Sequence, residues 1–351
     1  MNAEYLNILQ AATSRPIEHA EALYLFTHSE EHEAAEALFE TARLVREREN
    51  GTIFTACGGI ATVLACNLKP LCTYCPYWRE KGKQALSMEE ILKAVGYLFA
   101  HGVYDFHLSG GTTLGSEGQD ILAIVRGIYN AGFTEAQIDV NCGAAMSLET
   151  LREIKGYGVK MVRSVFETRN PALFAAVKPG DSLAEKEAFA WRIGEAGISL
   201  GTGILAGISP TETKYQDYTD FLFQIKQFPH LSSLYVSKFV PFAGIALKGV
   251  EACSAQEAAR VIAMARLVLR NVDITGAQGW NKGKDGMTPF WAGGGNSALV
   301  IHINRIPAYV NRQEEDPTVT YEGTMEFRNR LEELEAYYAA QGMRLATPAA
   351  Q

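Results

Sequence analysis

Hydrophobic positions along this chain follow two spacings, which alternate from about residue 52 onward. Short apolar runs, typical of buried strands, are separated by segments in which apolar residues recur every three or four positions, as on one face of a helix. The predicted strands are residues 60–65, 105–109, 137–141, 160–166, 199–206, 233–240, 273–278 and 298–303. The predicted helices between them include residues 88–101, 117–131, 148–157, 184–196, 218–227 and 255–269.

This alternation predicts the fold class. Strands that are separated by helices pair in parallel through right-handed crossovers, which makes the sheet part of an α/β fold. Eight such units fit a closed (β/α)8 barrel of the TIM type. Functional residues of such a barrel lie at the carboxyl ends of its strands, so we expect the functional site on the loops that follow the strands.

Both ends of the chain carry helical patterns outside this repeat. The apolar residues 20–26 predict one helix, and Ser29-Glu-Glu-His is a capping signal for a second. We expect Arg43, Arg46 and Arg48 to form a solvated face of that second helix.

The C-terminal pattern predicts a closing amphipathic helix over residues 322–341, with Leu331, Leu334 and Tyr338 at helical spacing. Residues 346–351 are expected to be frayed. The predicted organisation is a helical cap over 1–50, a barrel over 51–322, and a C-terminal helix and tail over 323–351.

The composition is that of a globular protein: 47% of the 351 residues are hydrophobic and 21% are charged. A net charge of -8 argues against a nucleic-acid surface. No apolar run approaches the roughly 20 residues of a membrane helix. Residues 1–20 contain Glu4, Arg15 and Glu18 and lack the pattern of a signal peptide, which predicts a cytoplasmic protein.

Three of the six cysteines, Cys66, Cys72 and Cys75, lie within ten residues of one another in the pattern C-x5-C-x2-C. In a reducing cytosol such a trio indicates metal ligation rather than disulfides. Three thiolates would leave one iron of a four-iron cluster open to another ligand. The alternatives are a zinc site that lacks its fourth ligand, or buried cysteines without a function. The isolated Cys57, Cys142 and Cys253 are interpreted as small buried hydrophobes.

Polar and glycine-rich residues follow the first four predicted strands. The cysteine loop follows the first, and the next three are followed by Ser109-Gly-Gly-Thr-Thr, Asn141-Cys-Gly and Phe166-Glu-Thr. A barrel would gather these segments at one end. This agreement between motif and predicted fold favours an enzyme.

With its three cysteines on the loop after the first predicted strand, the sequence resembles the radical S-adenosylmethionine (SAM) enzymes, of which this arrangement is the signature. Tyr74 fills the aromatic position before the last cysteine. The resemblance covers residues 20–345, and Glu167-Thr168, the glycine-flanked strand 203–207 and Phe239-Val-Pro are similar to the biotin synthase, HydE and methylornithine synthase group. The usual spacing is C-x3-C-x2-C, and the longer first gap resembles that of the HmdB-type (HcgA) family.

The resemblance implies roles for individual residues. Cys66, Cys72 and Cys75 would hold a [4Fe-4S] cluster, and Lys186 would stand where relatives carry an arginine for the SAM carboxylate. Thr112 replaces the acid of a family Gly-Gly-Glu motif, so its contact would use the hydroxyl or nearby carbonyls. The implied cofactor-binding residues are Tyr74, Ser109, Gly110, Gly111, Thr112, Asn141, Glu167, Lys186 and Ile204.

The activity implied by the resemblance is reductive cleavage of SAM to methionine and a 5′-deoxyadenosyl radical, which then takes a hydrogen atom from a small-molecule substrate. The electron would come from an external reductant of the ferredoxin or flavodoxin type. The HmdB-type family is implicated in building the iron-guanylylpyridinol (FeGP) cofactor of [Fe]-hydrogenase. The alternatives are a methylornithine-synthase-like or biotin-synthase-like enzyme that acts on another small substrate, and a metal-binding scaffold without catalysis.

Further substrate candidates follow the later strands. The glycine-rich segments 276–286 and 293–296 have two interpretations: they cradle an anionic substrate through backbone N–H groups, or they are turns that glycine permits. Arg163 would need an anionic partner if it is buried. His107 is interpreted as a structural histidine, and Tyr77 and Trp78 as a cover over the cysteine loop. The substrate candidates are Arg163, Gln278, Trp280, Asn281 and Lys282.

Overall fold

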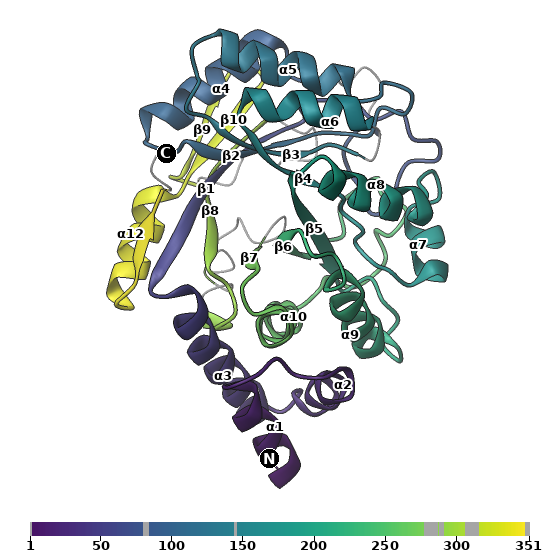
Figure 1. Cartoon of the computed structure of the whole chain (residues 1–351), viewed down its shortest axis with the longest axis vertical. Coiled ribbons are helices and arrows are strands. Elements are labelled where there is room, and N and C mark those ends of the chain that lie inside the picture. The colour runs from purple at the N-terminus through teal and green to yellow at the C-terminus, as the bar shows by residue number, and fades with distance from the viewer. Residues whose placement is uncertain are drawn as a thin grey trace.

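The computed structural model describes residues 2–79, 84–143, 146–276, 287, 291–305 and 316–347. Eight parallel strands form the ring of a TIM-type barrel, seen end-on in Figure 1. The strand order is β7-β6-β5-β4-β3-β2-β1-β8. The strands are β1 (Ile53–Ala61), β2 (Asp105–Ser109), β3 (Gln137–Asn141), β4 (Val159–Arg163), β5 (Ser199–Ala206), β6 (Leu231–Lys238), β7 (Asp273–Gly276) and β8 (Ser297–Arg305).

The ring is completed between β7 and β8 by Asn296. Its backbone N–H donates to the carbonyl of Ile274 at 3.0 Å, and its side-chain oxygen accepts from the Ile274 N–H at 2.8 Å. Its side-chain amide also donates to Asp273 at 2.7 Å. One side chain therefore substitutes for part of a strand ladder at this seam.

Helices surround the ring, as predicted, and most begin at a capping side chain. Ser87 begins α4, Ser182 begins α8 and Ser254 begins α10, each by accepting a hydrogen bond from a backbone N–H of the first turn. The helices of the repeat are α4 (Met88–Ala100), α5 (Gln119–Asn130), α6 (Leu148–Ile154) continued by a 3-10 turn (Lys155–Tyr157), α8 (Leu183–Glu195), α9 (Lys214–Ile225) and α10 (Ala255–Leu269). A further helix, α7 (Pro171–Val177), was not predicted.

The first strand was predicted too late in the chain. Ile53–Ala61 is paired on both sides, by β2 and β8, although Cys57, Gly58 and Gly59 have little intrinsic strand preference. Pairing in the barrel overrides that preference. The strand ends at Thr62, whose φ of 64° turns the backbone out of the sheet, so residues 62–65 belong to the following loop. Strand β4 likewise ends at Arg163, before the predicted limit.

Three N-terminal helices lie outside the ring of strands, next to the outer helices α9 and α10: α1 (Ala3–Ala12), α2 (His19–His28) and α3 (His32–Asn50). Helix α3 packs on α10, which is why α10 is buried along most of its length. The prediction of a solvated arginine face was wrong for Arg46, which is 1% exposed and stacks over Phe54 with 5.2 Å between its guanidinium carbon and the ring centroid. The capping signal at Ser29 was also misplaced, because α3 begins after Glu31.

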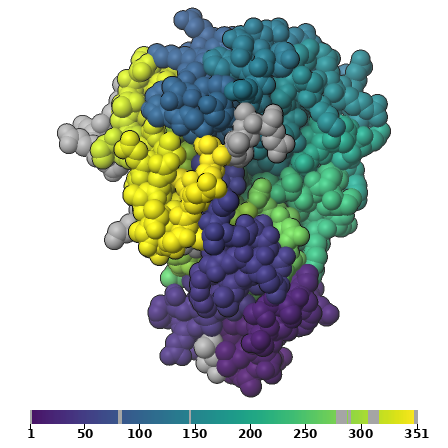
Figure 2. Space-filling view, turned by 60° about the vertical axis from the view of Figure 1, so that its left-hand side comes forward, coloured from purple at the N-terminus to yellow at the C-terminus, as the bar shows by residue number. Residues whose placement is uncertain are grey.

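The C-terminal segment joins the sheet, contrary to the single helix predicted over 322–341. An antiparallel hairpin of β9 (Val319–Glu322) and β10 (Met325–Asn329) extends β8, and the helix α12 covers only Leu331–Ala340. Residues Arg344–Ala346, which end at the first residue of the tail expected to fray (346–351), form β11, which pairs with Ile53–Thr55 at the start of β1, ahead of the stretch that pairs with β2. In Figure 2 the yellow C-terminal segment lies against the N-terminal helices. Tyr338 of α12 stacks on Phe54 of β1, with 4.5 Å between the ring centroids.

No helix among the described residues combines the length and the apolar character that a membrane span requires.

Candidate active site

The cysteine loop crosses the carboxyl end of the barrel and rests on the glycine-rich loop after β2. The N–H of Val63 donates to the carbonyl of Ser109 at 3.0 Å, and that of Gly111 donates to Leu64 at 2.8 Å. A Cβ at Gly111 would lie 2.5 Å from the backbone nitrogen of Cys66. A glycine is therefore required here for the two loops to approach so closely.

The long first gap of the motif is accommodated by three local contacts. Asn67 accepts a hydrogen bond from the N–H of Leu114 at 2.8 Å and donates to the carbonyl of the same residue at 3.0 Å. Leu68 is 3% exposed and anchors the loop in the interior. A Cβ at Gly180 would lie 2.2 Å from the carbonyl oxygen of Pro70, so the α7–α8 connection supports the middle of the gap.

The second half of the loop is fixed by its backbone. The N–H of Thr73 donates to the carbonyl of Val177 at 2.8 Å, and its own carbonyl accepts from Ala246 at 3.1 Å. The guanidinium of Arg79 donates to the carbonyls of Cys75, at 2.7 Å, and Cys72. Arg79 therefore holds the two cysteines of the C-x2-C pair in one turn.

A cavity of about 250 Å³ lies under this loop, at the carboxyl end of the barrel where the sequence places the chemistry. It is lined by all three cysteines of the motif. The predicted residues that line it are Cys66, Cys72, Cys75, Tyr74, Ser109, Gly110, Gly111, Thr112, Asn141, Arg163, Glu167 and Lys186. Tyr77, Trp78 and His107 line it as well.

Two groups of predicted residues are not part of this lining. Ile204 is buried in β5 and meets the site only through its backbone, as the bridge partner of Glu167. The substrate candidates Gln278, Trp280, Asn281 and Lys282 lie outside the described residues.

Glu167 holds a carboxylate at the wall of the cavity. Its φ of 65° is a conformation that non-glycine residues rarely adopt, and it turns the side chain away from the ladder that its backbone makes with β5. The phenol of Tyr74 donates to Oε1 at 3.3 Å, whereas Oε2 is buried and has no hydrogen-bond partner among the described residues. Burial raises the pKa of Glu167, and Lys178 and Lys186 oppose that rise. The free oxygen is suited to a hydrogen-bond donor or cationic group of a ligand.

Lys178 and Lys186 face the same wall and share one counter-ion. The carboxylate of Asp181 lies 3.1 Å from Nζ of Lys178 and 3.5 Å from Nζ of Lys186. Burial and repulsion by Lys178 lower the pKa of Lys186 to about 8, whereas Asp181 and the nearby Cys72 and Glu167 outweigh burial and raise the pKa of Lys178. Two cations with one adjacent carboxylate form a site for an additional anionic group.

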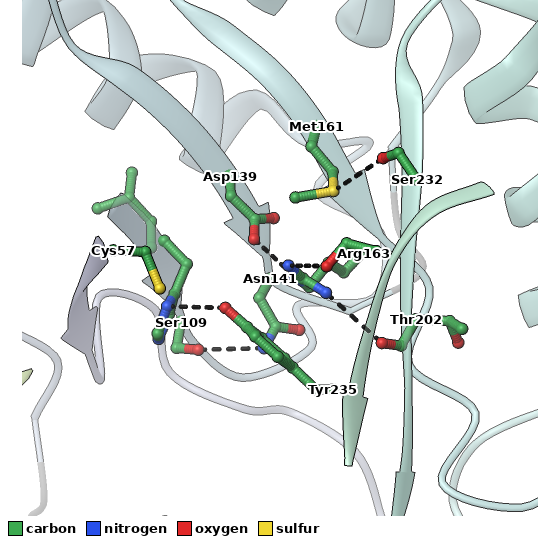
Figure 3. A network of polar contacts seen from close by, with 12 residues as sticks. Cys57, Ser109, Asp139, Asn141, Met161, Arg163, Thr202, Ser232 and Tyr235 are labelled. Atoms are coloured by element: carbon green, nitrogen blue, oxygen red, sulfur yellow. Dashed lines mark hydrogen bonds and ion pairs between the residues drawn. The ribbon is translucent and has the colours of Figure 1, made fainter. Parts of the chain in front are cut away.

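Arg163, one of the residues that line the cavity, is also the centre of a polar network inside the barrel, shown in Figure 3. Its guanidinium donates to Asp139 at 2.6 Å and to the hydroxyl of Ser233 at 3.0 Å. It also lies 3.6 Å from the ring centroid of Tyr235. The expectation that a buried Arg163 needs an anionic partner is confirmed, and Asp139 is that partner.

Several cavity residues were not found from the sequence. Lys178 and Asp181 follow the unpredicted helix α7, so nothing placed them at the barrel end. Tyr235 and His302 lie within strands β6 and β8. The alternation of Ser233, Tyr235 and Ser237 in an otherwise apolar strand was a usable signal, because residues two apart in a strand face the same side.

The three thiols of the loop fit a metal cluster chemically. Burial raises the pKa of Cys72 and, to about 12, that of Cys75, so without a metal these thiols keep their protons. Binding a soft metal would displace the protons. Among the described residues, no three His, Cys, Asp or Glu side chains converge as the ligands of a single metal ion would.

Comparisons with known proteins agree with this geometry. The model of the Radical SAM superfamily matches residues 60–222. The uncharacterized protein MJ0785 of Methanocaldococcus jannaschii is 29% identical over 216 residues, which span 60% of this chain and 56% of that protein.

Solved structures share the fold over nearly the whole chain. Methylornithine synthase (PylB) has a TM-score of 0.77 at 20% identity, covering 98% of this chain and 97% of its own. HydG from Carboxydothermus hydrogenoformans, a maturase of FeFe-hydrogenase, has a TM-score of 0.78 at 18% identity, covering 99% and 80%. The three-cysteine loop, the barrel and the matched segment 60–222 agree with one another, and this part of the chain is similar to the Radical SAM superfamily, whose members use a [4Fe-4S] cluster and SAM.

Proposed function

We propose that this protein is a radical SAM enzyme that acts in the biosynthesis of the FeGP cofactor of [Fe]-hydrogenase. In this proposal Cys66, Cys72 and Cys75 hold the [4Fe-4S] cluster. When bound and reduced, cluster and SAM together supply a 5′-deoxyadenosyl radical. The observation that carries the proposal is that the three thiols line one cavity at the carboxyl end of the barrel.

The chain's own residues would bind and orient SAM. Lys186, with Lys178 beside it, offers ammonium groups to the SAM carboxylate, and the free oxygen of Glu167 offers an acceptor to the SAM amino group. The close approach of Gly111 to Cys66 leaves backbone rather than a side chain beside the cluster. Tyr74, Tyr77 and Trp78 line the same cavity and would exclude water from it.

The assignment to FeGP biosynthesis rests on the C-x5-C-x2-C spacing. The contacts of Asn67, Leu68 and Gly180 support each part of the longer gap, which is therefore a built feature of the loop rather than an irregular insertion. The proposed partners are a small-molecule substrate and a one-electron reductant of the ferredoxin or flavodoxin type.

Anaerobic reconstitution tests the SAM chemistry. The expected result is about four irons per chain, a reduced EPR signal that changes when SAM is added, and 5′-deoxyadenosine after dithionite is supplied. Colourless protein with stoichiometric zinc would overturn the proposal. A cluster that neither responds to SAM nor yields 5′-deoxyadenosine would support a scaffold instead.

A genetic experiment tests the pathway. Deleting the gene from a cell that makes [Fe]-hydrogenase should leave the hydrogenase polypeptide without its guanylylpyridinol cofactor. Complementation with the wild type, and not with a variant that carries Cys66→Ala, should restore the cofactor. Full hydrogenase activity in the deletion strain would contradict the assignment while leaving the SAM chemistry intact.

A further inference from the structure

The floor of the cavity differs in chemistry from its rim. We define the floor as His107, Tyr235, Ser237, Leu299 and His302, which all line the cavity and come from strands β2, β6 and β8. Three of these residues present rings. The ring centroids of His107 and Tyr235 are 5.7 Å apart, and those of His107 and His302 are 6.4 Å apart.

The polar groups of the floor are uncharged near neutral pH. Burial, with some repulsion by Arg328, lowers the pKa of His302 to about 4. Burial also holds the pKa of His107 well below its usual value and that of Tyr235 well above its usual value. The two imidazoles and the phenol are therefore all neutral, in contrast to Glu167, Lys178 and Lys186 at the rim.

The charges beneath the floor are already matched. Arg163 is 3% exposed, and its donors are directed to Asp139, Ser233 and the carbonyl of Thr202. Its cation is thus paired with Asp139 instead of being directed at a ligand. A ligand that buried a full charge on this floor would meet no free counter-ion among the described residues, which is costly.

The floor nevertheless offers hydrogen bonds of both kinds. The phenol oxygen of Tyr235 lies 3.0 Å from Nδ1 of His107, so one of these residues donates to the other. In either tautomer the pair keeps one N–H or O–H donor that is not used within it. His302 has no hydrogen-bond partner among the described residues, so its ring offers both a donor and an acceptor.

Gly59 makes room for this arrangement. A Cβ at this position would lie 2.4 Å from Cε1 of His107 and 2.6 Å from its Nε2. The imidazole edge therefore packs beside the backbone of β1 at Gly59, in space that the side chain of any other residue would fill.

We propose that the floor binds an uncharged, planar molecule that carries both a hydrogen-bond donor and an acceptor, such as a cyclic amide. A flat ring would stack on the floor residues, and its N–H and C=O groups would meet the free groups of His302 and of the Tyr235–His107 pair. An amino acid with free ammonium and carboxylate groups would be rejected. This inference rests on the proposed function, because it takes the rim to be occupied by SAM, and it favours a pyridinol-type precursor over a methylornithine-type substrate.

Calorimetric titration of the reconstituted holoprotein tests the floor. The rim is first saturated with S-adenosylhomocysteine, and 2-pyridone and L-ornithine are then titrated as probes. We expect saturable binding of 2-pyridone and none of L-ornithine. Because a neutral hydrogen bond contributes about 1 kcal/mol, His302→Leu and Tyr235→Phe should each weaken 2-pyridone binding by about 3- to 10-fold.

The matched control is His32→Leu, which makes the same histidine-to-leucine change at an exposed position of α3. This variant should bind 2-pyridone like the wild type. The inference is overturned if 2-pyridone does not bind the wild type, if L-ornithine binds saturably, or if both floor variants retain wild-type affinity.

A second readout separates this inference from the proposed function. The EPR change caused by SAM reports the rim alone and should persist in both floor variants, which also shows that they are folded. Loss of the SAM effect in the wild type would overturn the proposed function. A normal SAM effect with unselective floor binding would overturn only the inference about substrate class.

Discussion

At the scale of single residues, the three motif cysteines were predictable because local spacing alone identified them. Glu167 and Lys186 were found by position, and both line the cavity. Lys178, Asp181, Tyr235 and His302 were not found. Lys178 and Asp181 follow a helix that was not predicted, and His302 reaches the cavity only through pairing with strands distant in sequence, so no local pattern marked these three. Tyr235 was missed although its alternation with Ser233 and Ser237 was a usable signal.

The ligand assignment predicts the outcome of single cysteine substitutions. Cys66→Ala should reduce the iron of the reconstituted protein from about four atoms to the background, because the remaining two thiolates hold a cluster poorly. Iron analysis and the visible spectrum measure this. Cys253→Ala is the control, since that thiol packs against Gly207 and does not line the cavity. An intact cluster in the Cys66 variant would show that another residue is the third ligand.

Lys186 predicts a pH dependence of SAM binding. Its pKa is lowered to about 8 by burial and by Lys178, so below pH 8 the ammonium is available to a carboxylate and above pH 8 it is lost. The affinity for SAM should therefore fall as the pH rises through about 8. Lys186→Arg should remove this fall, because a guanidinium keeps its proton. Calorimetry over this range measures both, and a wild-type affinity that is constant across pH 8 would contradict the role.

At the scale of elements, prediction succeeded where periodicity and capping agreed. The bounds of β2, β3, β5 and α10 are as predicted, and Ser254 caps α10. Prediction failed for β1, because its glycines are held by pairing on both edges, and for β11, a strand that no pattern over residues 344–346 predicted. Pairing with a strand that is distant in the sequence leaves no pattern in the amino-acid sequence of either strand.

The contact between the glycine loop and the cysteine loop can be tested at this scale. Gly111→Ala should prevent the cysteine loop from closing, since the new Cβ would lie 2.5 Å from backbone atoms of Ala65 and Cys66. We expect a folded protein with little reconstituted iron. Gly156→Ala is the matched control, because nothing lies within 4 Å of a Cβ there. Circular dichroism measures whether the variants are folded, and iron analysis measures whether the cluster site is formed. Full iron content in the Gly111 variant would exclude a tight contact between the glycine loop and the cysteine loop.

At the scale of the whole molecule, the alternation of strands and helices was sufficient to predict a barrel with its site at the carboxyl end. It was not sufficient to predict how the barrel is completed. The seam between β7 and β8 depends on Asn296, and the adjacent buried Arg266 donates to the same side-chain oxygen at 2.8 Å. Asn296 belongs to the glycine-rich stretch 293–296, which was interpreted as a possible ligand cradle. In the structure this stretch has a structural role. Gly294 supports that role, since its carbonyl accepts from Arg266 at 2.9 Å.

This seam predicts the largest effect on stability. Asn296→Ala would leave the N–H of Ile274 and a donor of the fully buried Arg266 without their acceptor. An unsatisfied buried donor costs about 1–3 kcal/mol, so the two together should lower the free energy of unfolding by about 2–6 kcal/mol. Urea denaturation of the wild type and the variant measures the difference, with the exposed Asn130→Ala as control. His302 of β8 and Gly276 at the end of β7 both line the cavity. Asn296→Ala should therefore also weaken the binding of 2-pyridone, and by more than the loss of folded protein alone would explain. Wild-type stability with unchanged binding would show that the ring is completed without this side chain.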